Sequence, residues 1–288
     1  MFILLIFFYI ILMNTIKNLV VAGGGAKNLF IIGLLQKLNI NDVSNYAGVS
    51  SGSFVIYLLS IGYTPFEIEQ LALELDLTSF MGEPSIENIL LLKSITNLDN
   101  VKVVLQTLTN YKFKKDSITF QELYTKTNKI IHIGVTSLTN TNFTIFNYQN
   151  YPNVNIIDAI LASCSLPGIF PPYKINNSYY CDGGVLNNCP IDIFQNDIKN
   201  TIAFMFEIPP YSNNFNILQY ISFAIGMPFK NRTKTLLSKY PDNIIVFKDN
   251  KIPLVDFNLT KTKIKNTINY GKNINNLINK ESFIKLFS

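Results

Sequence analysis

Apolar and polar positions along the chain fall into blocks that predict strands followed by helices. Residues 18–22 form a short apolar run, three glycines follow it, and apolar residues then recur at helical spacing from Leu29 to Leu38. Side chains three or four positions apart lie on one face of a helix. This segment therefore predicts a strand, a glycine loop and a helix.

A second unit of the same kind follows directly. Residues 45–48 predict a short strand, and residues 51–61 predict a helix that ends at Gly62. The later segments that we expect to be regular are the paired strands Lys129–Thr136 and Asn142–Phe146, the helix Val154–Ser163, and the strands Thr201–Phe206 and Asn243–Phe247. Strands that alternate with helices favour an α/β sheet covered on both faces.

Two further helices carry explicit start signals. Thr64 is a predicted N-cap, Pro65 suits the first turn, and Glu67 stands at the capping-box position. Thr119 and Glu122 repeat the capping-box spacing. Because a capping box pairs backbone N–H groups that a helix start leaves free, these are the sharpest boundaries that the sequence predicts.

The composition is that of a globular protein with a large core. The 288 residues are 48% hydrophobic and 15% charged, which suits one domain of this length. We expect residues 18–288 to form that domain, with a motif-bearing core over about 18–207 and a basic closing segment at 248–288. Residues 1–17 form a separate, apolar N-terminal segment.

The N-terminal segment contains an uninterrupted apolar and aromatic run from Phe2 to Met13. A helix that crosses a membrane needs about 20 residues, and a signal peptide needs a basic start and a small-residue cleavage site that are missing here. The alternatives are a shallow membrane anchor, the remnant of a signal anchor, or an upstream start of a protein that begins at Met13.

The net charge of +5 is concentrated at the end of the chain. Residues 248–288 contain eight lysines and three acidic residues, whereas residues 1–247 contain 16 basic and 16 acidic residues. The basic segment is either a solvated, lysine-rich helical face or a surface for anionic lipid headgroups, to which each lysine contributes about 1 kcal/mol. Nucleic acid is not an expected partner, because no zinc, helix-turn-helix or RNP signature accompanies the charge.

The cysteines indicate a reducing environment. Cys164, Cys181 and Cys189 are odd in number and lack C-x-x-C spacing, so we expect free, buried thiols and no structural metal site. Together with the N-terminal segment, this predicts an intracellular protein that is peripheral at membranes.

Residues 48–52 have the pattern G-x-S-x-G, which is typical of a nucleophilic serine on a sharp turn between a strand and a helix. Gly48 and Gly52 leave room for the turn, and Ser50 is its middle residue. Ordinary Ser/Gly turns also match this pattern, so the motif needs support from elsewhere in the chain.

The glycine loop, Gly23 to Gly25, precedes a predicted helix. Its backbone N–H groups therefore suit a phosphate or the oxyanion of an acyl-transfer intermediate. A dinucleotide site is not favoured, because Asn28 replaces the third motif glycine and Asp42 lies in a stretch that does not predict a strand. An oxyanion loop that serves Ser50 accounts for both motifs.

The base for such a serine is expected to be a carboxylate. The single histidine, His132, lies at the centre of the apolar run Ile130–Ile133, which is typical of a half-buried strand position. No histidine follows it, as the chain order of hydrolase triads would require. Asp182 is the best candidate, because Gly183 and Gly184 follow it on a predicted tight loop, although Asp-Gly also forms purely structural turns.

These motifs, in this order, resemble those of the patatin-like phospholipase family. They are the segment Gly23-Gly24-Gly25-Ala26-Lys27, the segment Gly48–Gly52, and Asp182-Gly183-Gly184. Two further segments resemble the family through Ala162, Ser163, Ser165, Pro167, Phe170 and Pro171, and through Val185, Leu186, Asn187, Asn188 and Pro190. Residues 256–259 and Gly271 resemble its closing helix, so the resemblance covers about residues 18–275.

The resemblance implies a three-layer α/β/α sandwich with a mostly parallel central sheet. It implies a serine-aspartate dyad, with Ser50 as nucleophile and Asp182 as proton acceptor, and an oxyanion hole of backbone N–H groups from Gly23, Gly24 and Gly25. The implied reaction is phospholipase A-like hydrolysis of fatty acyl esters through an acyl-enzyme, in lipid catabolism. No metal and no cofactor is required, and the expected partners are an acyl lipid and a membrane surface.

Two positions depart from the family pattern. The family usually has Asp or Ser where this chain has Ala22, and glycine where it has Asn28. Asparagine adopts positive φ less readily than glycine, but we expect the loop to tolerate it. Lys27 is expected to favour an anionic headgroup or to fix the loop. Two alternatives use the same features: a catalytically idle, lipid-binding relative and an acyltransferase with the same dyad.

Overall fold

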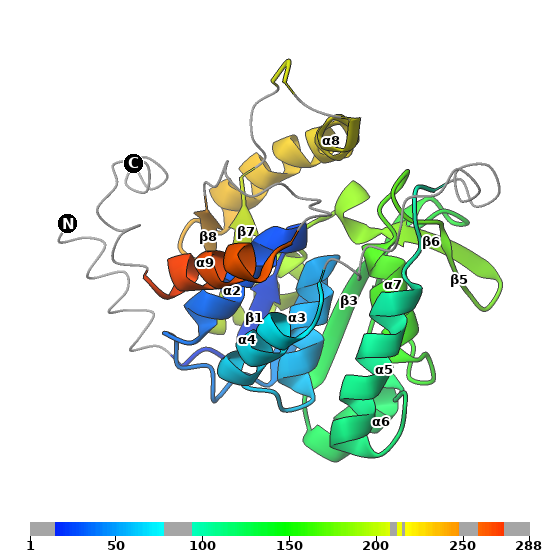
Figure 1. Ribbon diagram of the computed structural model, residues 1–288, viewed down its shortest axis with the longest axis vertical. Helices are drawn as coiled ribbons and strands as arrows, with labels where there is room; N and C mark the ends of the chain where they lie inside the picture. Colours follow the sequence, from blue (N-terminus) through cyan, green and yellow to red (C-terminus); the bar gives the residue numbers. More distant parts are fainter. Residues whose placement is uncertain (1–14, 78–93, 208–211, 215–216, 248–258, 274–288) are drawn as a thin grey trace.

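The computed structural model describes residues 15–77, 94–207, 212–214, 217–247 and 259–273 (Figure 1). The apolar run Phe2–Met13 and most of the basic closing segment lie outside these residues. Within the described ranges, no helix combines the length and the apolar character needed to cross a bilayer.

Eight strands in the described part of the chain form one mixed sheet. They are β1 (Asn18–Val21), β2 (Asn45–Val49), β3 (Ile130–Ser137), β4 (Asn142–Phe146), β5 (Tyr173–Ile175), β6 (Ser178–Asp182), β7 (Thr201–Phe206) and β8 (Ile244–Phe247). The order is β5-β6-β3-β2-β1-β7-β8, with β4 paired to β3 off this path. The neighbours from β3 to β8 are parallel, whereas β4, β5 and β6 pair antiparallel.

Helices cover both faces of the sheet, which confirms the three-layer sandwich (Figure 1). The α-helices are α2 (Asn28–Leu35), α3 (Ser51–Ser60), α4 (Pro65–Glu74), α5 (Asp99–Phe113), α6 (Phe120–Thr127), α7 (Ile156–Cys164), α8 (Ile217–Lys239) and α9 (Lys261–Lys272). Short 3-10 helices are η1 (Gly25–Lys27), η4 (Gly183–Val185) and η5 (Ile191–Asn200). The larger core lies under α2 to α7 and α9, and a smaller one under α8 and η5.

The predicted helix starts agree with the structure where a cap defines them. Both capping boxes are present, at Thr64 with Glu67 and at Thr119 with Glu122. The helix expected over Val154–Ser163 begins instead at Ile156, because the Asn155 side chain accepts a hydrogen bond from the N–H of Ile157 at 2.9 Å and caps the helix there.

The closing helix α9 packs directly on α2 through two glycines. A Cβ on Gly33 would lie 2.0 Å from the carbonyl oxygen of Ile268, and one on Gly271 would lie 2.0 Å from that of Phe30. The opposite side of α9 is a solvated lysine face, with Lys261, Lys263 and Lys265 exposed. The lysines in the described part of the basic segment are therefore exposed, as both alternatives require.

The three cysteines are all free thiols, as expected. Cys181 and Cys189 are buried, whereas Cys164, at the end of α7, is only half-buried.

Candidate active site

Ser50 occupies the predicted sharp turn between β2 and α3. Its backbone has φ 53° and ψ −135°, and a positive φ strains any residue other than glycine. The carbonyl oxygen of Ser50 accepts hydrogen bonds from the N–H and the hydroxyl of Ser53, at 2.9 and 2.5 Å. The first turn of α3 therefore holds the strained residue in place.

Glycine at position 52 allows the turn to pack against β1. A Cβ on Gly52 would lie 2.1 Å from the carbonyl oxygen of Val21, at the end of β1. A Cβ on Gly48 would lie 2.8 Å from the carbonyl group of Gly52. Both flanking glycines of the motif are thus required by close backbone contacts.

A serine from α7 ties the turn to β3. Ser163 Oγ accepts a hydrogen bond from the N–H of Ser50 at 2.8 Å and donates one to the carbonyl oxygen of Gly134 at 2.7 Å. Two residues later, the carbonyl oxygen of Ser165 accepts the N–H of Asp182 at 2.9 Å. The end of α7 therefore positions both members of the expected dyad.

Asp182 lies at the end of β6, beside Ser50. Its carboxyl group interacts with the side chain of Ser50, and its Oδ1 accepts the N–H of Gly184 at 2.7 Å. The residue is only 3% exposed. Burial raises the pKa of Asp182 from 3.8 to about 6, against the opposing effect of the two hydrogen bonds.

His132 lies on β3, as expected for a half-buried strand histidine, and its side chain contacts residues other than Ser50 and Asp182. Its Nδ1 is 3.2 Å from the Nδ2 of Asn147, and its ring packs edge-on against Phe194 with 5.5 Å between centroids. Burial lowers the pKa of His132 to about 4, so the ring is neutral near pH 7.

The glycine loop lies against the serine turn. A Cβ on Gly23 would be 3.0 Å from the Cβ of Ser50. The N–H groups of Gly23 and Gly24 donate long hydrogen bonds, of 3.4 Å to the carbonyl oxygen of Asn188 and 3.3 Å to Ser51 Oγ. In the described part of the chain, the N–H of Gly25, which has φ 54°, has no hydrogen-bond partner.

Asn188 links this loop to the aspartate loop. Its side-chain amide donates to the carbonyl oxygen of Gly23 at 2.8 Å, and its own carbonyl accepts the N–H of Gly23. A Cβ on Gly184 would lie 3.0 Å from the Oδ1 of Asn188. Asn188 therefore lies between the glycine loop and the turn after Asp182.

Asn28 does not need a positive φ, so the preference of asparagine for other backbone angles does not act against this loop. Its backbone is helical, with φ −66° and ψ −12°, and the positive φ belongs to Gly25. The Asn28 side chain is 3% exposed, and its Nδ2 donates to Ser51 Oγ at 2.7 Å and to the carbonyl oxygen of Ala22 at 3.1 Å. Asn28 thus joins the start of the loop to the residue that follows Ser50.

Lys27 is buried, with 4% of its surface exposed. Its Nζ lies 5.7 Å from the centre of the Phe206 ring. Of its two expected roles, this position favours fixing the loop over contact with a lipid headgroup.

Sequence reasoning missed the roles of Ser163, Asn188 and Ser51. The first two lie in segments that resemble the family, but their hydrogen-bond partners are far away in the chain. Ser51 was assigned only to the following helix. Its position directly after a candidate nucleophile was the available signal, since that residue commonly supplies an oxyanion N–H.

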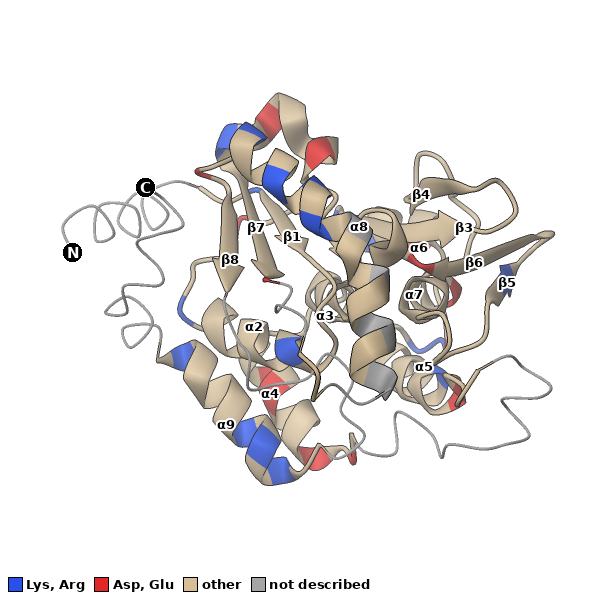
Figure 2. Cartoon of the chain, turned by 90° about the horizontal axis from the view of Figure 1, so that it is seen from above, with Lys and Arg blue, Asp and Glu red and all other residues tan. Residues whose placement is uncertain are grey.

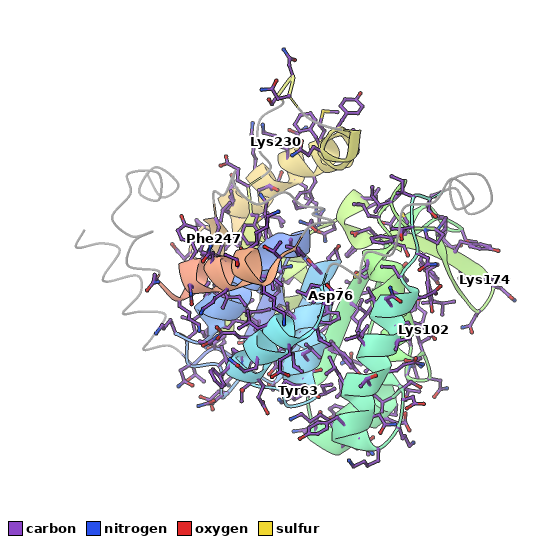
Figure 3. All side chains as sticks on the ribbon, viewed as in Figure 1. Tyr63, Asp76, Lys102, Lys174, Lys230 and Phe247 are labelled. Atoms are coloured by element: carbon purple, nitrogen blue, oxygen red, sulfur yellow. The ribbon has the colours of Figure 1, made fainter. Side chains whose placement is uncertain are left out.

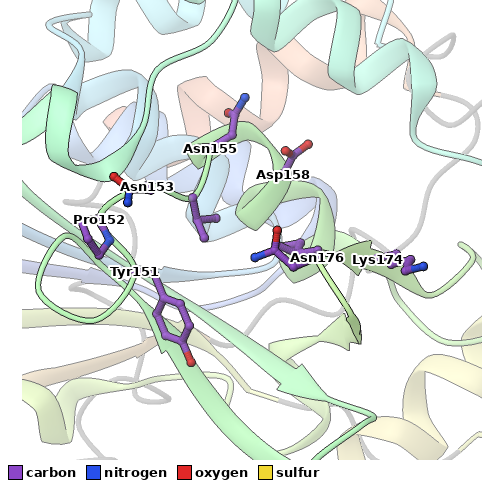
Figure 4. A pocket seen from close by; sticks show the side chains of 9 residues that line it. Tyr151, Pro152, Asn153, Asn155, Asp158, Lys174 and Asn176 are labelled. Atoms are coloured by element: carbon purple, nitrogen blue, oxygen red, sulfur yellow. The ribbon is translucent and has the colours of Figure 1, made fainter.

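A polar pocket of about 500 Å³ lies away from these residues (Figure 4). It is lined by Tyr151, Asn155, Asp158, Lys174 and Asn176, among others. Asn155 caps the N-terminal end of α7, whereas Ser163 contacts Ser50 from the other end of that helix. The pocket is therefore separate from the candidate active site.

Comparison with known proteins identifies the family. The sequence profile of the patatin-like phospholipases matches residues 19–194, which include the glycine loop, Ser50 and Asp182. The chain belongs to the patatin-like phospholipase family. Members of this family are hydrolases of ester bonds.

Relatives of this patatin-like protein include viral and yeast proteins. It is 38% identical to "Probable lipid hydrolase 463L" of Invertebrate iridescent virus 6 over 187 residues, which are 62% of each chain. It is 27% identical to triacylglycerol lipase 5 of Saccharomyces cerevisiae over 83% of this chain and 37% of the yeast protein. The matched region thus spans less than two thirds of either relative.

A solved structure shares the fold of this patatin-like protein. The crystal structure of VipD from Legionella pneumophila superposes with a TM-score of 0.60 at 17% identity, over 94% of this chain and 66% of VipD.

Proposed function

We propose that this patatin-like protein is a phospholipase A-like lipid acyl hydrolase with a Ser50–Asp182 dyad. The observation that carries the proposal is the interaction between the side chain of a serine on a strained turn, at φ 53°, and a buried carboxyl group. In the first step, Ser50 Oγ attacks the carbonyl carbon of a fatty acyl ester while its proton passes to Asp182. The tetrahedral intermediate collapses to an acyl-enzyme, and the leaving alcohol takes the proton from Asp182.

Water completes the cycle. It attacks the acyl carbonyl of the acyl-enzyme, and Asp182 again accepts the proton. The second intermediate releases the fatty acid, and Ser50 recovers its proton from Asp182. Asp182 thus gives up each proton that it accepts within the same half-reaction.

Backbone N–H groups form the proposed oxyanion hole. The sequence points to Gly23, Gly24 and Gly25, and the closeness of Gly23 to Ser50 supports this assignment, since a Cβ on Gly23 would lie 3.0 Å from the Cβ of Ser50. Of the three N–H groups, that of Gly25 is the best placed to donate a hydrogen bond to a new acceptor. The N–H of Ser51, at the first position of α3, supplies a further donor. Loss of one such donor costs about 100-fold or more in kcat.

An aspartate can serve as base here because its environment raises its pKa. A proton acceptor works best when its pKa lies near the working pH, and Asp182 is shifted from 3.8 to about 6. A site that excludes water also suits an acyl chain, because the chain is apolar.

We propose phospholipids as substrates, at a membrane surface and in lipid catabolism. The relatives named lipid hydrolase and triacylglycerol lipase support an acyl lipid of this general class. The proposed setting is intracellular, with peripheral attachment to membranes.

The direct test is fatty-acid release by the purified protein from a panel of phospholipid vesicles and triacylglycerol emulsions. We expect release from phospholipid that falls at least about 1,000-fold in Ser50→Ala, the order of loss seen when a catalytic nucleophile is removed. Release by Ser50→Ala at the wild-type rate would exclude the proposed nucleophile. Release from triacylglycerol alone would exclude the proposed substrate.

A further inference from the structure

The outer face of α8 carries apolar and basic side chains in two consecutive blocks. Tyr220 and Met227 are 52% and 51% exposed, and Lys230 and Lys234 are also exposed. At 100° per residue, Tyr220 and Met227 fall within about 20° of each other before Pro228, and Lys230 and Lys234 fall within about 40° of each other after it. Leu236, which is buried, lies on the opposite side. Because a proline inside a helix bends it, the exposed stripe of α8 has an apolar part before Pro228 and a basic part after it.

This stripe begins near the candidate active site. Strands β7 and β8 are parallel, so the α8 connection between them starts at the carboxyl edge of the sheet, the edge where Ser50 follows β2. Figures 1 and 2 both show α8 over this part of the molecule. The helix packs against η4, the turn that follows Asp182. Leu186, directly after η4, is 43% exposed and adds a third apolar side chain.

The charge of α8 is entirely positive. The helix contains four basic residues and no acidic residue, and Figure 2 shows its basic positions in blue. Arg232 and Lys239 pair with Asp192, at 3.0 and 3.3 Å. In the described ranges, no salt bridge involves Lys230, labelled in Figure 3, or Lys234. These two ammonium groups are therefore available to an anionic partner.

Another exposed patch has charges of both signs. Val103 and Tyr111 on α5 are 59% and 69% exposed. The nearby Lys112 and Lys115 pair with carboxylates of Glu67 and Glu122, at 3.8 and 2.6 Å. Among the residues that the structure describes, the exposed Lys114, whose Nζ lies 5.8 Å from the centre of the Tyr111 ring, is in no salt bridge. The α5 patch thus combines apolar and basic side chains with carboxylates, whereas α8 has no acidic residue, and it serves as a matched comparison.

We propose that Leu186, Tyr220, Met227, Lys230 and Lys234 form a docking face for an anionic lipid bilayer. Apolar side chains next to basic ones bind a membrane interface by burying apolar area and attracting acidic headgroups. The apolar block is the part nearer the active site, where an acyl chain would have to leave the bilayer. This inference rests on the proposed function for its purpose, but the binding itself requires no catalysis.

The test is cosedimentation with vesicles of phosphatidylcholine alone and with vesicles that also contain phosphatidylglycerol. The charge variant is Lys230→Glu with Lys234→Glu, and its control is Lys261→Glu with Lys265→Glu on α9. We expect the α8 variant to bind the anionic vesicles about tenfold more weakly or worse, since each lysine near such a surface contributes to binding. The α9 control is expected to bind as the wild type does.

Apolar substitutions test the other block. Tyr220→Ser with Met227→Ser is expected to weaken binding to both vesicle types about tenfold, whereas Val103→Ser with Tyr111→Ser leaves it unchanged. Equal binding by the α8 variants and their controls, or no vesicle binding by the wild type, would overturn the docking face.

An activity ratio separates this inference from the proposed function. Hydrolysis of anionic vesicles, divided by hydrolysis of a water-soluble short-chain ester, is expected to fall about tenfold in the α8 charge variant. If the wild type hydrolysed neither the anionic vesicles nor the short-chain ester, the proposed function alone would be contradicted. An unchanged ratio in an active α8 variant would contradict the docking face alone.

Discussion

The side-chain amide of Asn28 donates a hydrogen bond of 2.7 Å to Ser51 Oγ, on the residue directly after Ser50. Ser51 Oγ also accepts the N–H of Gly24, at 3.3 Å. One buried asparagine therefore connects the proposed oxyanion loop to the serine turn. Its effect on the reaction acts through the loop, which makes Asn28 a positioning residue.

Removal of this link is expected to reduce kcat more than it changes KM. We expect Asn28→Ala and Ser51→Ala each to lower kcat about tenfold, because a displaced oxyanion donor stabilises the transition state less. KM is expected to stay within about twofold, because the loop does not hold the acyl chain. Steady-state kinetics of both variants and of the double variant measure this. If the two losses in the free energy of activation simply added in the double variant, a shared network would be contradicted.

The pH dependence of the reaction is expected to follow Asp182. Only the ionised carboxylate can accept a proton, and its pKa is raised to about 6. We therefore expect kcat/KM to rise with pH through a midpoint near 6. His132, with a pKa of about 4, cannot supply this midpoint. A profile that stays flat between about pH 5 and about pH 7 would contradict the assignment.

Stability is expected to depend on pH through the same carboxyl group. Because the pKa of Asp182 is higher in the folded state, the folded protein binds the proton more tightly. This stabilisation is complete below about pH 3.8 and is lost as the pH rises through about 6, at a cost of about 2–3 kcal/mol.

Asp182→Asn removes this titration. We expect the variant to have a higher free energy of unfolding than the wild type above about pH 6, and the difference to shrink at lower pH. Denaturant unfolding of both proteins across this range measures it. A difference that does not vary with pH would show that Asp182 has an ordinary pKa.

Two glycines offer a matched test of the packing at the serine turn. A Cβ on Gly52 would lie 2.1 Å from a backbone oxygen of Val21, whereas one on Gly62, with φ 92°, would have no atom within 4 Å. We expect Gly52→Ala to cost about 3 kcal/mol or more and Gly62→Ala only about 1 kcal/mol of backbone strain. Thermal unfolding distinguishes the two. Equal costs would show that strain, and not packing, governs the turn.

Local rules predicted much of the fold because local chemistry decides those elements. The capping boxes at Thr64 and Thr119 define helix starts within four residues of chain. By contrast, α5 and α8 were not predicted. Exposed apolar side chains such as Tyr111 of α5 and Met227 of α8 interrupt the polar face that an amphipathic pattern requires, and Pro228 in the middle of α8 is a residue that usually ends a helix.

The site was predictable where one motif carries it and unpredictable where distant partners meet. The turn at Ser50 and the short strand before Asp182 followed from adjacent residues. The hydrogen bonds of Ser163 to Ser50 and of Asn188 to Gly23 join positions more than 100 residues apart. The helical conformation of Asn28 could not be read from the family pattern, because the sequence does not show that the positive φ of the loop belongs to Gly25.

The most direct test of the dyad is the rate at which a fluorophosphonate labels Ser50, followed by mass spectrometry of the labelled peptide. The dyad predicts labelling of Ser50 in the wild type and an equal labelling rate in His132→Gln. In Asp182→Asn it predicts a labelling rate that is lower by about 100-fold or more. Labelling that survives Asp182→Asn but is lost in His132→Gln would contradict the account.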